Sequence, residues 1–290
     1  MTRRRVTQLG VATLVLTALG SAAVVPAGAD IAISSRRAGS MDVWRIGGTA
    51  VRLTNAGAGD RHASWSPNGR RIAFMSMRAG GNPDIYVMRS NGSRVRRLTS
   101  APGEDCCPEW SPDGKRIVFQ SHRTGQFDIW VMRTDGSRQR NVTAHPAYDG
   151  TPTWSPSAKR IAFRSTRNGR NDIWVVRANG KHPRRVTDGR GFSRTPDWAP
   201  KGGRIAFVND RAGGDDLYVI RASGRGLRRV TAGGGSDRNP AWYPHGRALL
   251  FDSNRRGDRD IFRVTIGTGA VRRLTSHPAE DILPVFRGQG

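Results

Sequence analysis

The stretch "WSPDGKRIVFQS", Trp110 to Ser121, decides the fold because closely related stretches recur along the chain. The copies begin at four further tryptophans, Trp65, Trp154, Trp198 and Trp242. Consecutive copies start 45, 44, 44 and 44 residues apart. Beyond each copy the similarity continues through a turn, an Asp-Ile-Trp/Tyr segment, a second turn and an Arg-Leu/Val-Thr segment. The repeat of about 44 residues therefore indicates an array of similar structural units.

Each unit reads as four short strands separated by turns. In one copy, the Pro and Gly of residues 111–114 suit a turn, and 116–121 and 128–133 are rich in β-forming residues. The segment 139–143 supplies the last strand, and no window after residue 30 has helical periodicity. Successive apolar residues at 129–132 are typical of a strand that is covered on both faces. Radially stacked four-stranded sheets provide that cover, which predicts a β-propeller.

The two ends of the chain determine the number of blades. Residues 31–54 match the last three strands of a unit, and residues 281–286 match only the first strand. Together these fragments make one unit. We therefore predict an all-β, six-bladed propeller of four-stranded blades of about 44 residues. The C-terminal strand closes the ring by pairing with the N-terminal partial blade, which removes exposed sheet edges.

The first 29 residues have the features of a secretory signal peptide. "MTRRR" is positive, residues 11–25 are largely apolar, and Ala27-Gly28-Ala29 is a small-residue cleavage site. The apolar core of about 15 residues is shorter than the roughly 20 that a membrane span needs. We expect cleavage before Asp30, a single propeller domain over 30–290, and a protein that is secreted or lies in the periplasm or cell envelope without a membrane span.

The chain is strongly basic, with a formal net charge of +25, and only four of its 48 basic residues are lysines. This charge predicts attraction to anionic partners that weakens with salt. Arginines recur in the predicted fourth strands, where they would either bind anionic polymers or protect an exposed sheet edge. Their spread around the ring, together with export, argues against a nucleic-acid partner.

The motif D-x-x-P-x-W-S-P-D-G-K-R-I-x-F-x-S-x-R-x-G-x-x-D-I-W-V-M, residues 105–132, resembles the WD40-like repeat of the TolB-family propeller. The resemblance extends over all of the predicted mature chain. It implies a six-bladed propeller in the cell envelope that acts through protein contacts rather than catalysis. In that family an α/β domain precedes the propeller, whereas here we expect the propeller to follow the signal peptide directly.

Arginine recurs after the second strand of each unit, and aspartate follows five or six residues later. We expect these residues to pair and brace the central hairpin of each blade, because repeated positions usually serve the repeat itself. The alternative is a ring of metal or substrate carboxylates. The predicted pairs are Arg37–Asp42, Arg78–Asp84, Arg123–Asp128, Arg167–Asp172, Arg211–Asp216 and Arg255–Asp260.

A second aspartate lies five residues before each tryptophan or its substitute, except in one unit, which has Ser193. These residues form a candidate binding rim at the mouth of the central tunnel, able to take a cationic group or a metal ion. Capping of loops is the alternative interpretation. The rim candidates are Asp60, Asp105, Asp149, Asp237 and Asp281.

No sequence motif indicates catalysis, a cofactor or a resident metal. The six histidines are scattered through different units. Cys106 and Cys107 are adjacent, and they could be free thiols, form an intermolecular disulfide or form a strained vicinal disulfide. We expect a monomeric, non-enzymatic interaction or scaffold protein with a protein partner. The rival hypothesis is a metal-dependent propeller enzyme or carbohydrate-binding protein that uses the tunnel.

Overall fold

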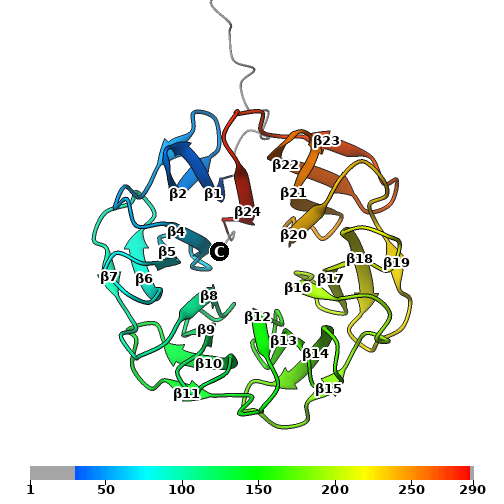
Figure 1. Ribbon diagram of the computed structural model, residues 1–290, viewed down its shortest axis with the longest axis horizontal. Coiled ribbons are helices and arrows are strands. Elements are labelled where there is room, and N and C mark those ends of the chain that lie inside the picture. The colour runs from blue at the N-terminus through cyan, green and yellow to red at the C-terminus, as the bar shows by residue number, and fades with distance from the viewer. Residues whose placement is uncertain (1–29, 288–290) are drawn as a thin grey trace, which may run out of the picture.

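Six four-stranded antiparallel sheets form a closed ring in the computed structural model, which describes residues 30–287 (Figure 1). The predicted all-β, six-bladed propeller is confirmed. The proposed signal peptide, residues 1–29, lies outside the described residues. Within the described range every regular element is a strand, and no helix is long and apolar enough to cross a membrane.

Five blades are continuous in sequence, and we number them in chain order. Blade 1 contains β4 (Asp60–Trp65), β5 (Arg71–Ser76), β6 (Asp84–Arg89) and β7 (Arg96–Arg97). Blade 2 contains β8 (Asp105–Trp110), β9 (Arg116–Ser121), β10 (Asp128–Arg133) and β11 (Arg140–Asn141). Blade 3 contains β12 (Asp149–Trp154), β13 (Arg160–Ser165), β14 (Asp172–Arg177) and β15 (Arg184–Arg185). Blade 4 contains β16 (Arg194–Trp198), β17 (Arg204–Asn209), β18 (Asp216–Arg221) and β19 (Arg228–Arg229). Blade 5 contains β20 (Asp237–Trp242), β21 (Ala248–Arg256), β22 (Asp258–Thr265) and β23 (Val271–Arg273).

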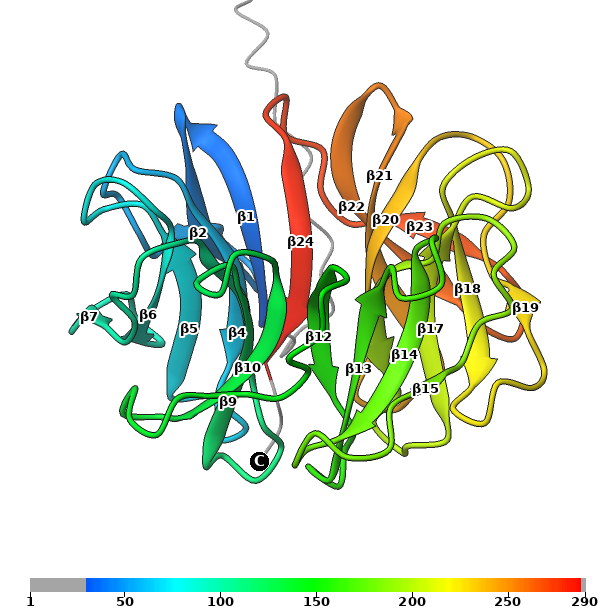
Figure 2. The ribbon, with the colours of Figure 1, turned by 60° about the horizontal axis from the view of Figure 1, so that its bottom comes forward.

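The sixth blade, here called the closing blade, joins the two ends of the described chain. It contains β24 (Asp281–Phe286), β1 (Ile31–Ala38), β2 (Ser40–Ile46) and β3 (Val51–Arg52) in that spatial order. β24 pairs antiparallel with β1 from Ile31 opposite Phe286 to Ser35 opposite Asp281. Figure 2 shows β24 alongside β1. The predicted closure by the C-terminal strand is therefore confirmed.

The fourth strand of each blade is shorter than the sequence indicates. In blade 2 the predicted strand 139–143 reduces to Arg140 and Asn141, which pair with Val131 and Trp130. Beyond Asn141, the Thr143 hydroxyl accepts a hydrogen bond of 3.0 Å from the Ile129 amide. The threonine hydroxyl thus accepts the hydrogen bond that a backbone carbonyl would accept in a longer strand. The same threonine bond recurs in the other five blades.

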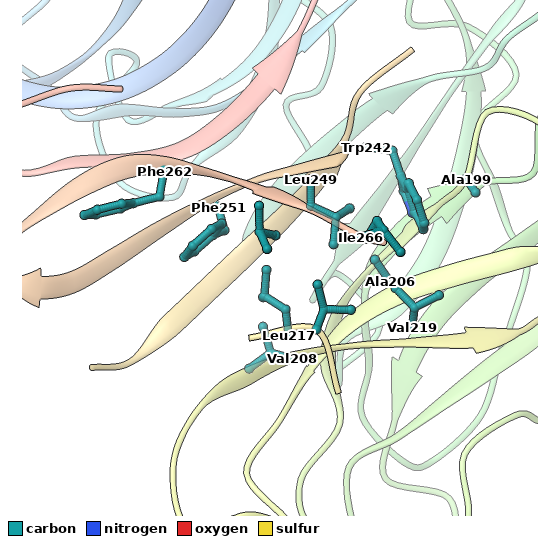
Figure 3. Packing of buried hydrophobic residues seen from close by; sticks show 12 residues of the cluster. Ala199, Ala206, Val208, Leu217, Val219, Trp242, Leu249, Phe251, Phe262 and Ile266 are labelled. Carbon is teal, nitrogen blue, oxygen red and sulfur yellow. The ribbon is translucent and has the colours of Figure 1, made fainter. Parts of the chain in front are cut away.

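The hydrophobic core lies between blades rather than within them. One cluster packs Val208 and Leu217 of blade 4 against Leu249 and Phe251 of blade 5 (Figure 3). The second strands of blades 1 to 5 each contribute a fully buried phenylalanine, 45, 44, 44 and 44 residues apart, namely Phe74, Phe119, Phe163, Phe207 and Phe251. Because each sheet is covered by its neighbours on both faces, its middle strands carry apolar residues at successive positions.

Candidate functional site: the central channel

The first strands of all six blades surround a central channel with a cavity of about 330 Å³. In Figure 1 these strands form the inner circle around the axis. Each contributes residues of the segment that leads to its tryptophan, or to Phe286 in the closing blade; the tryptophans that themselves line the cavity are Trp65, Trp110, Trp198 and Trp242. The repeated Pro-x-Trp signature therefore forms the wall of the channel. No arginine or lysine lines this cavity in residues 30–287, although the chain is highly basic.

A backbone bulge in every first strand determines which side chains reach the channel. In each blade the register with the second strand shifts immediately before the proline position. The residue at the bulge adopts a left-handed φ between 43° and 56°, which asparagine and histidine accept more readily than the other residue types found there. Six residues hold this position and line the cavity: His62, Cys107, Thr151, Thr195, Asn239 and Leu283.

The residue before the tryptophan connects neighbouring blades. Glu109 accepts a hydrogen bond of 2.9 Å from the Trp154 amide, and Asp197 accepts one of 2.6 Å from the Trp242 amide. Ser64 accepts the equivalent bond, 3.0 Å long, from the Trp110 amide. These side chains line the channel and hold adjacent first strands together.

Glu109 and Asp197 are the acidic side chains of the channel lining. Burial, together with the charge of Asp197, raises the pKa of Glu109 from 4.5 to about 8. Burial also raises the pKa of Asp197, from 3.8 to about 7. Their hydrogen bonds to backbone amides favour the ionised forms but do not offset burial. Near neutral pH this pair of carboxyl groups therefore retains protons that a cation in the channel would displace.

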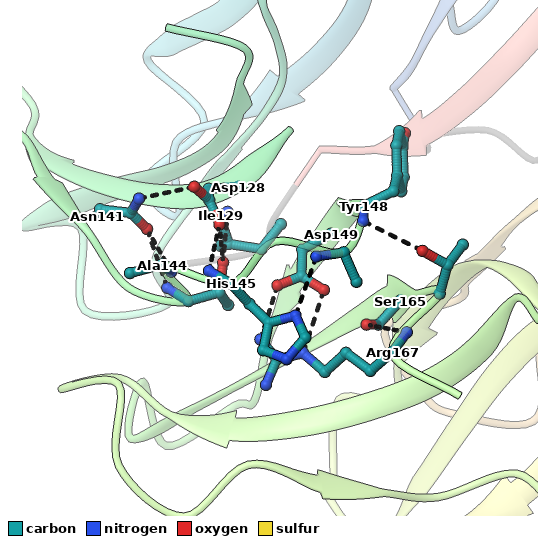
Figure 4. Close-up of polar contacts among 12 residues, drawn as sticks. Asp128, Ile129, Asn141, Ala144, His145, Tyr148, Asp149, Ser165 and Arg167 are labelled. Carbon is teal, nitrogen blue, oxygen red and sulfur yellow. Dashed lines mark hydrogen bonds and ion pairs between the residues drawn. The ribbon is translucent and has the colours of Figure 1, made fainter. Parts of the chain in front are cut away.

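The predicted rim aspartates occupy a different environment. All five are fully buried, and each forms an ion pair with an arginine of the turn after the second strand. Arg167 Nη2 and Asp149 Oδ2 lie 2.7 Å apart. Figure 4 shows the two side chains facing each other. None of the five appears in the cavity lining. Asp60, Asp105, Asp149, Asp237 and Asp281 thus form buried ion pairs instead of an open acidic rim.

The predicted pairing within the central hairpin is also replaced. Arg78 contacts Asp60, not Asp84, because its Nε bonds to Ser76 and its guanidinium lies over Phe74 and Tyr86. This placement directs the arginine towards the first strand. Four blades repeat it through Arg37, Arg123, Arg167 and Arg255. The aspartates expected as partners, Asp42, Asp84, Asp172, Asp216 and Asp260, pair with fourth-strand arginines, and Asp128 bonds to Asn141.

Blade 4 is the exception in both the sequence and the structure. Ser193 replaces the aspartate, and Asn209 stands where the other five blades have serine, namely Ser35, Ser76, Ser121, Ser165 and Ser253. Asn209 donates a 2.9 Å hydrogen bond to Ser193, and Arg211 pairs with Asp188 at 2.6 Å. A neutral amide–hydroxyl pair thus takes the place of the buried charge pair.

Many of the fourth-strand arginines have structural partners. Arg97, Arg185, Arg229 and Arg273 contact the aspartates at the start of the third strands. In four blades the first residue of the fourth strand is an arginine whose side chain donates a hydrogen bond to a backbone carbonyl of the next blade. These residues are Arg96, Arg140, Arg184 and Arg228. These contacts account for much of the arginine in the repeat.

Sequence reasoning did not single out the channel residues His62, Cys107, Glu109 and Asp197. Aligning the units on their tryptophans would have placed His62 and Cys107 at one ring position and Glu109 and Asp197 at another. In the folded chain, Cys107 Sγ lies 3.8 Å from His62 Nε2 and 3.0 Å from Cys106 Sγ. Both cysteines are free thiols. Among residues 30–287 no group of three or more His, Cys, Asp or Glu has an arrangement suited to a metal ion.

Solved structures confirm the architecture. TolB from Acinetobacter baumannii is 18% identical with a TM-score of 0.76, and the match covers 89% of this chain and 66% of that chain. A putative TolB from Agrobacterium tumefaciens is 21% identical with a TM-score of 0.71, and the match covers 93% and 92% of the two chains. An oligogalacturonate lyase in complex with manganese is 18% identical with a TM-score of 0.59, covering 89% and 74%.

This chain thus spans slightly less than two thirds of the Acinetobacter protein. At these identities the structures establish the fold alone, because one fold supports many functions. The sequence provides the family. The TolB beta propeller domain model, PD40, matches residues 98–190 and 184–290, which together exceed half of the chain. The chain therefore belongs to the TolB beta propeller family.

Proposed function

We propose that this protein is an exported, non-enzymatic interaction module of the cell envelope, which holds a segment of a protein partner in its central channel. The observation that carries the proposal is the contrast between a basic chain and a channel that is lined by two carboxyl groups and, within residues 30–287, by no arginine or lysine. Glu109 and Asp197 lie among tryptophans and prolines, with no lysine or arginine in the lining from residues 30–287. We further propose that the protein acts as a monomer.

The channel wall is suited to binding a polypeptide. Four tryptophans and Phe286 present aromatic surface, and prolines stiffen the strands between them. The wall belongs to first strands that are linked from blade to blade by side-chain hydrogen bonds. A preorganised wall lowers the entropic cost of binding, which favours docking of an extended segment.

The two carboxyl groups favour a partner segment with a lysine or arginine side chain. A cation between them stabilises their ionised forms, so binding releases protons whenever the free carboxyl groups are protonated. With pKa values of about 8 for Glu109 and about 7 for Asp197, binding strengthens as the pH rises from 6 to 8.5. A partner without a cationic side chain would show no such pH dependence.

Calorimetry with short peptides centred on lysine, arginine, norleucine or glutamate tests the chemistry. We expect the cationic peptides to bind at least tenfold more tightly than norleucine at pH 8.5, a difference of about 1.4 kcal/mol. The double variant Glu109→Gln/Asp197→Asn should lose this preference while keeping the acceptors for the tryptophan amides. Equal binding of all four peptides to both proteins would contradict the proposal.

Site-specific photo-cross-linking in the native envelope tests the location. A cross-linker at Thr195, in the channel, should yield a discrete protein adduct that disappears in the Glu109→Gln/Asp197→Asn variant. A matched cross-linker at the exposed Lys181, in the outer turn of blade 3, should not. An adduct that forms only from Lys181 would place the docking surface outside the channel.

A further inference from the structure

A cluster of two thiols and an imidazole lies at the channel wall and includes neither residue of the acidic pair. Cys107 occupies the bulge of β8 and His62 occupies the same position in β4 of the neighbouring blade. Cys107 Sγ lies 3.0 Å from Cys106 Sγ and 3.8 Å from His62 Nε2. Cys107 is half-buried and lines the cavity, whereas Cys106 is only 4% exposed. The cluster thus has one accessible sulfur and one sheltered sulfur.

The bulge brings the two sulfurs together. In a regular strand, adjacent side chains point to opposite faces of the sheet, so neighbouring cysteines do not meet. Here the register shifts between Cys106 and Glu109, and Cys107 has a left-handed φ of 56°. This turn of the backbone places both sulfurs on one side. The other five blades share the bulge but have no cysteine there, so the thiol cluster is particular to blade 2.

The surroundings make the two thiols chemically different. The hydrogen bond from Cys106, together with the charge of His62, lowers the pKa of Cys107 from 9.0 to about 5, although burial opposes this. The same bond and burial raise the pKa of Cys106 well above 9.0. Burial lowers the pKa of His62, but the Cys107 thiolate outweighs it, so the net shift is upwards. Other charged or titratable groups also face the cluster. The charge of Glu104 raises the pKa of Cys107 and so opposes thiolate formation, and the charge of Arg61 lowers the pKa of His62. Tyr148 is near both sulfurs.

We propose that Cys107, Cys106 and His62 form a thiol–disulfide exchange site for small disulfides that enter the channel. The Cys107 thiolate attacks one sulfur of the disulfide, the sulfur–sulfur bond breaks, and a mixed disulfide forms on Cys107. The released thiolate takes a proton from water. Cys106 then loses its proton to solvent and attacks the Cys107 sulfur, expelling the second small thiolate. The protein loses two electrons as a Cys106–Cys107 disulfide forms, and the small disulfide gains them as two thiols.

The exchange is a single-turnover reaction of the protein, so it is separate from the proposed binding of a peptide. Adjacent α-carbons lie near 3.8 Å, below the usual disulfide range, so the product ring is strained and readily reduced. An excess of small thiol should therefore restore both free cysteines.

Reaction with 2,2′-dithiodipyridine tests the site, because each exchange releases a coloured thione. We expect the wild type to release two equivalents and to retain no adduct by mass spectrometry, with a mass loss of two hydrogens. Cys106→Ser should release one equivalent and keep the adduct. At pH 6 the first step at Cys107 should be about tenfold faster than the reaction of free cysteine with the same disulfide. A larger fraction of Cys107 is thiolate at this pH, and this outweighs the lower nucleophilicity of a thiolate with a lower pKa. Cys107→Ser should remove this fast phase.

The pH dependence of the first step tests the role of His62. The rate should rise with a midpoint near pH 5 in the wild type and at least one unit higher in His62→Gln. His62→Gln should melt like the wild type, which separates this effect from misfolding. Glu109→Gln/Asp197→Asn should react normally, so failure of peptide binding and failure of exchange are distinguishable. A persistent adduct on the wild type, or a midpoint near 9 for Cys107, would overturn the proposal.

Discussion

Single arginine side chains connect the strands of each blade. In four blades the turn arginine lies over two aromatic rings and reaches a buried aspartate of the first strand, as Arg123 does with Phe119, Trp130 and Asp105. Burying one charge without the other is costly, so the repeat retains arginine and aspartate together. In blade 4, where the aspartate is serine, Arg211 still lies over Tyr218 but pairs with the more exposed Asp188.

Removing one of these arginines should destabilise the fold strongly. Arg167→Ala leaves the buried Asp149 carboxylate unpaired and should lower the free energy of unfolding by about 3 to 5 kcal/mol. Arg167→Ala/Asp149→Asn should recover part of this loss, because the buried charge is gone. Urea denaturation measures both. Arg185→Ala, which removes a more exposed pair, serves as the control and should cost less.

The acidic channel residue Glu109 should make stability depend on pH. Its pKa is about 8 when folded and near 4.5 when unfolded, so the folded state binds more protons between these values. The contribution of Glu109 to the free energy of unfolding is therefore fully present below pH 4.5 and is lost as the pH rises towards 8. Glu109→Gln should be more stable than the wild type at pH 9 by at least about 1.4 kcal/mol. Melting at pH 5 and 9 checks this; an advantage that is equal at both pH values would contradict it.

At the scale of strands, closure depends on one C-terminal element. β24 supplies the first strand of the closing blade, and its Asp281 pairs with Arg37 across that blade. Without β24, β1 would present an unpaired edge next to the channel. The predicted strands 116–121 and 128–133 match β9 and β10, since their β-rich composition and flanking turns fix both ends. β8 begins at Asp105, ahead of the bulge that its pattern does not reveal.

Deleting residues 281–290 should therefore lower the melting temperature by about 10 °C, as expected for a loss of about 3 to 5 kcal/mol. The exposed edge of β1 should also promote association. Scanning calorimetry and size-exclusion chromatography measure the two effects. A chain ending at Arg287 keeps β24 and is the matched control. Wild-type melting together with monomeric elution of the shorter chain would be inconsistent with closure through β24.

For the whole molecule, the inter-blade clusters make the ring a cooperative unit. Each cluster combines residues of two neighbouring blades, so no blade has a complete core of its own. Closure also gives every blade two neighbours, unlike the ends of an open repeat array. A substitution that destabilises one blade should therefore destabilise the whole ring.

Phe207→Ala tests this cooperativity. The side chain is fully buried between blades 3 and 4, and its loss should cost about 3 to 5 kcal/mol. We expect a single calorimetric transition at lower temperature, with the calorimetric and van't Hoff enthalpies still equal. Phe192→Ala, at a side chain 46% exposed, is the control and should change little. A separate early transition in Phe207→Ala would show that blades unfold independently.

The sequence by itself determined the number of blades, their strand order and the closure of the ring, because these follow from a repeat of about 44 residues and from two complementary end fragments. Only the tertiary structure decided which charges meet and which side chains face the channel. Arg78 pairs with Asp60 and not with Asp84 because its guanidinium stacks on aromatic rings. The bulge at Cys107 changes the direction of the Cys107 side chain. Both outcomes depend on packing in three dimensions, for which residue spacing carries no signal.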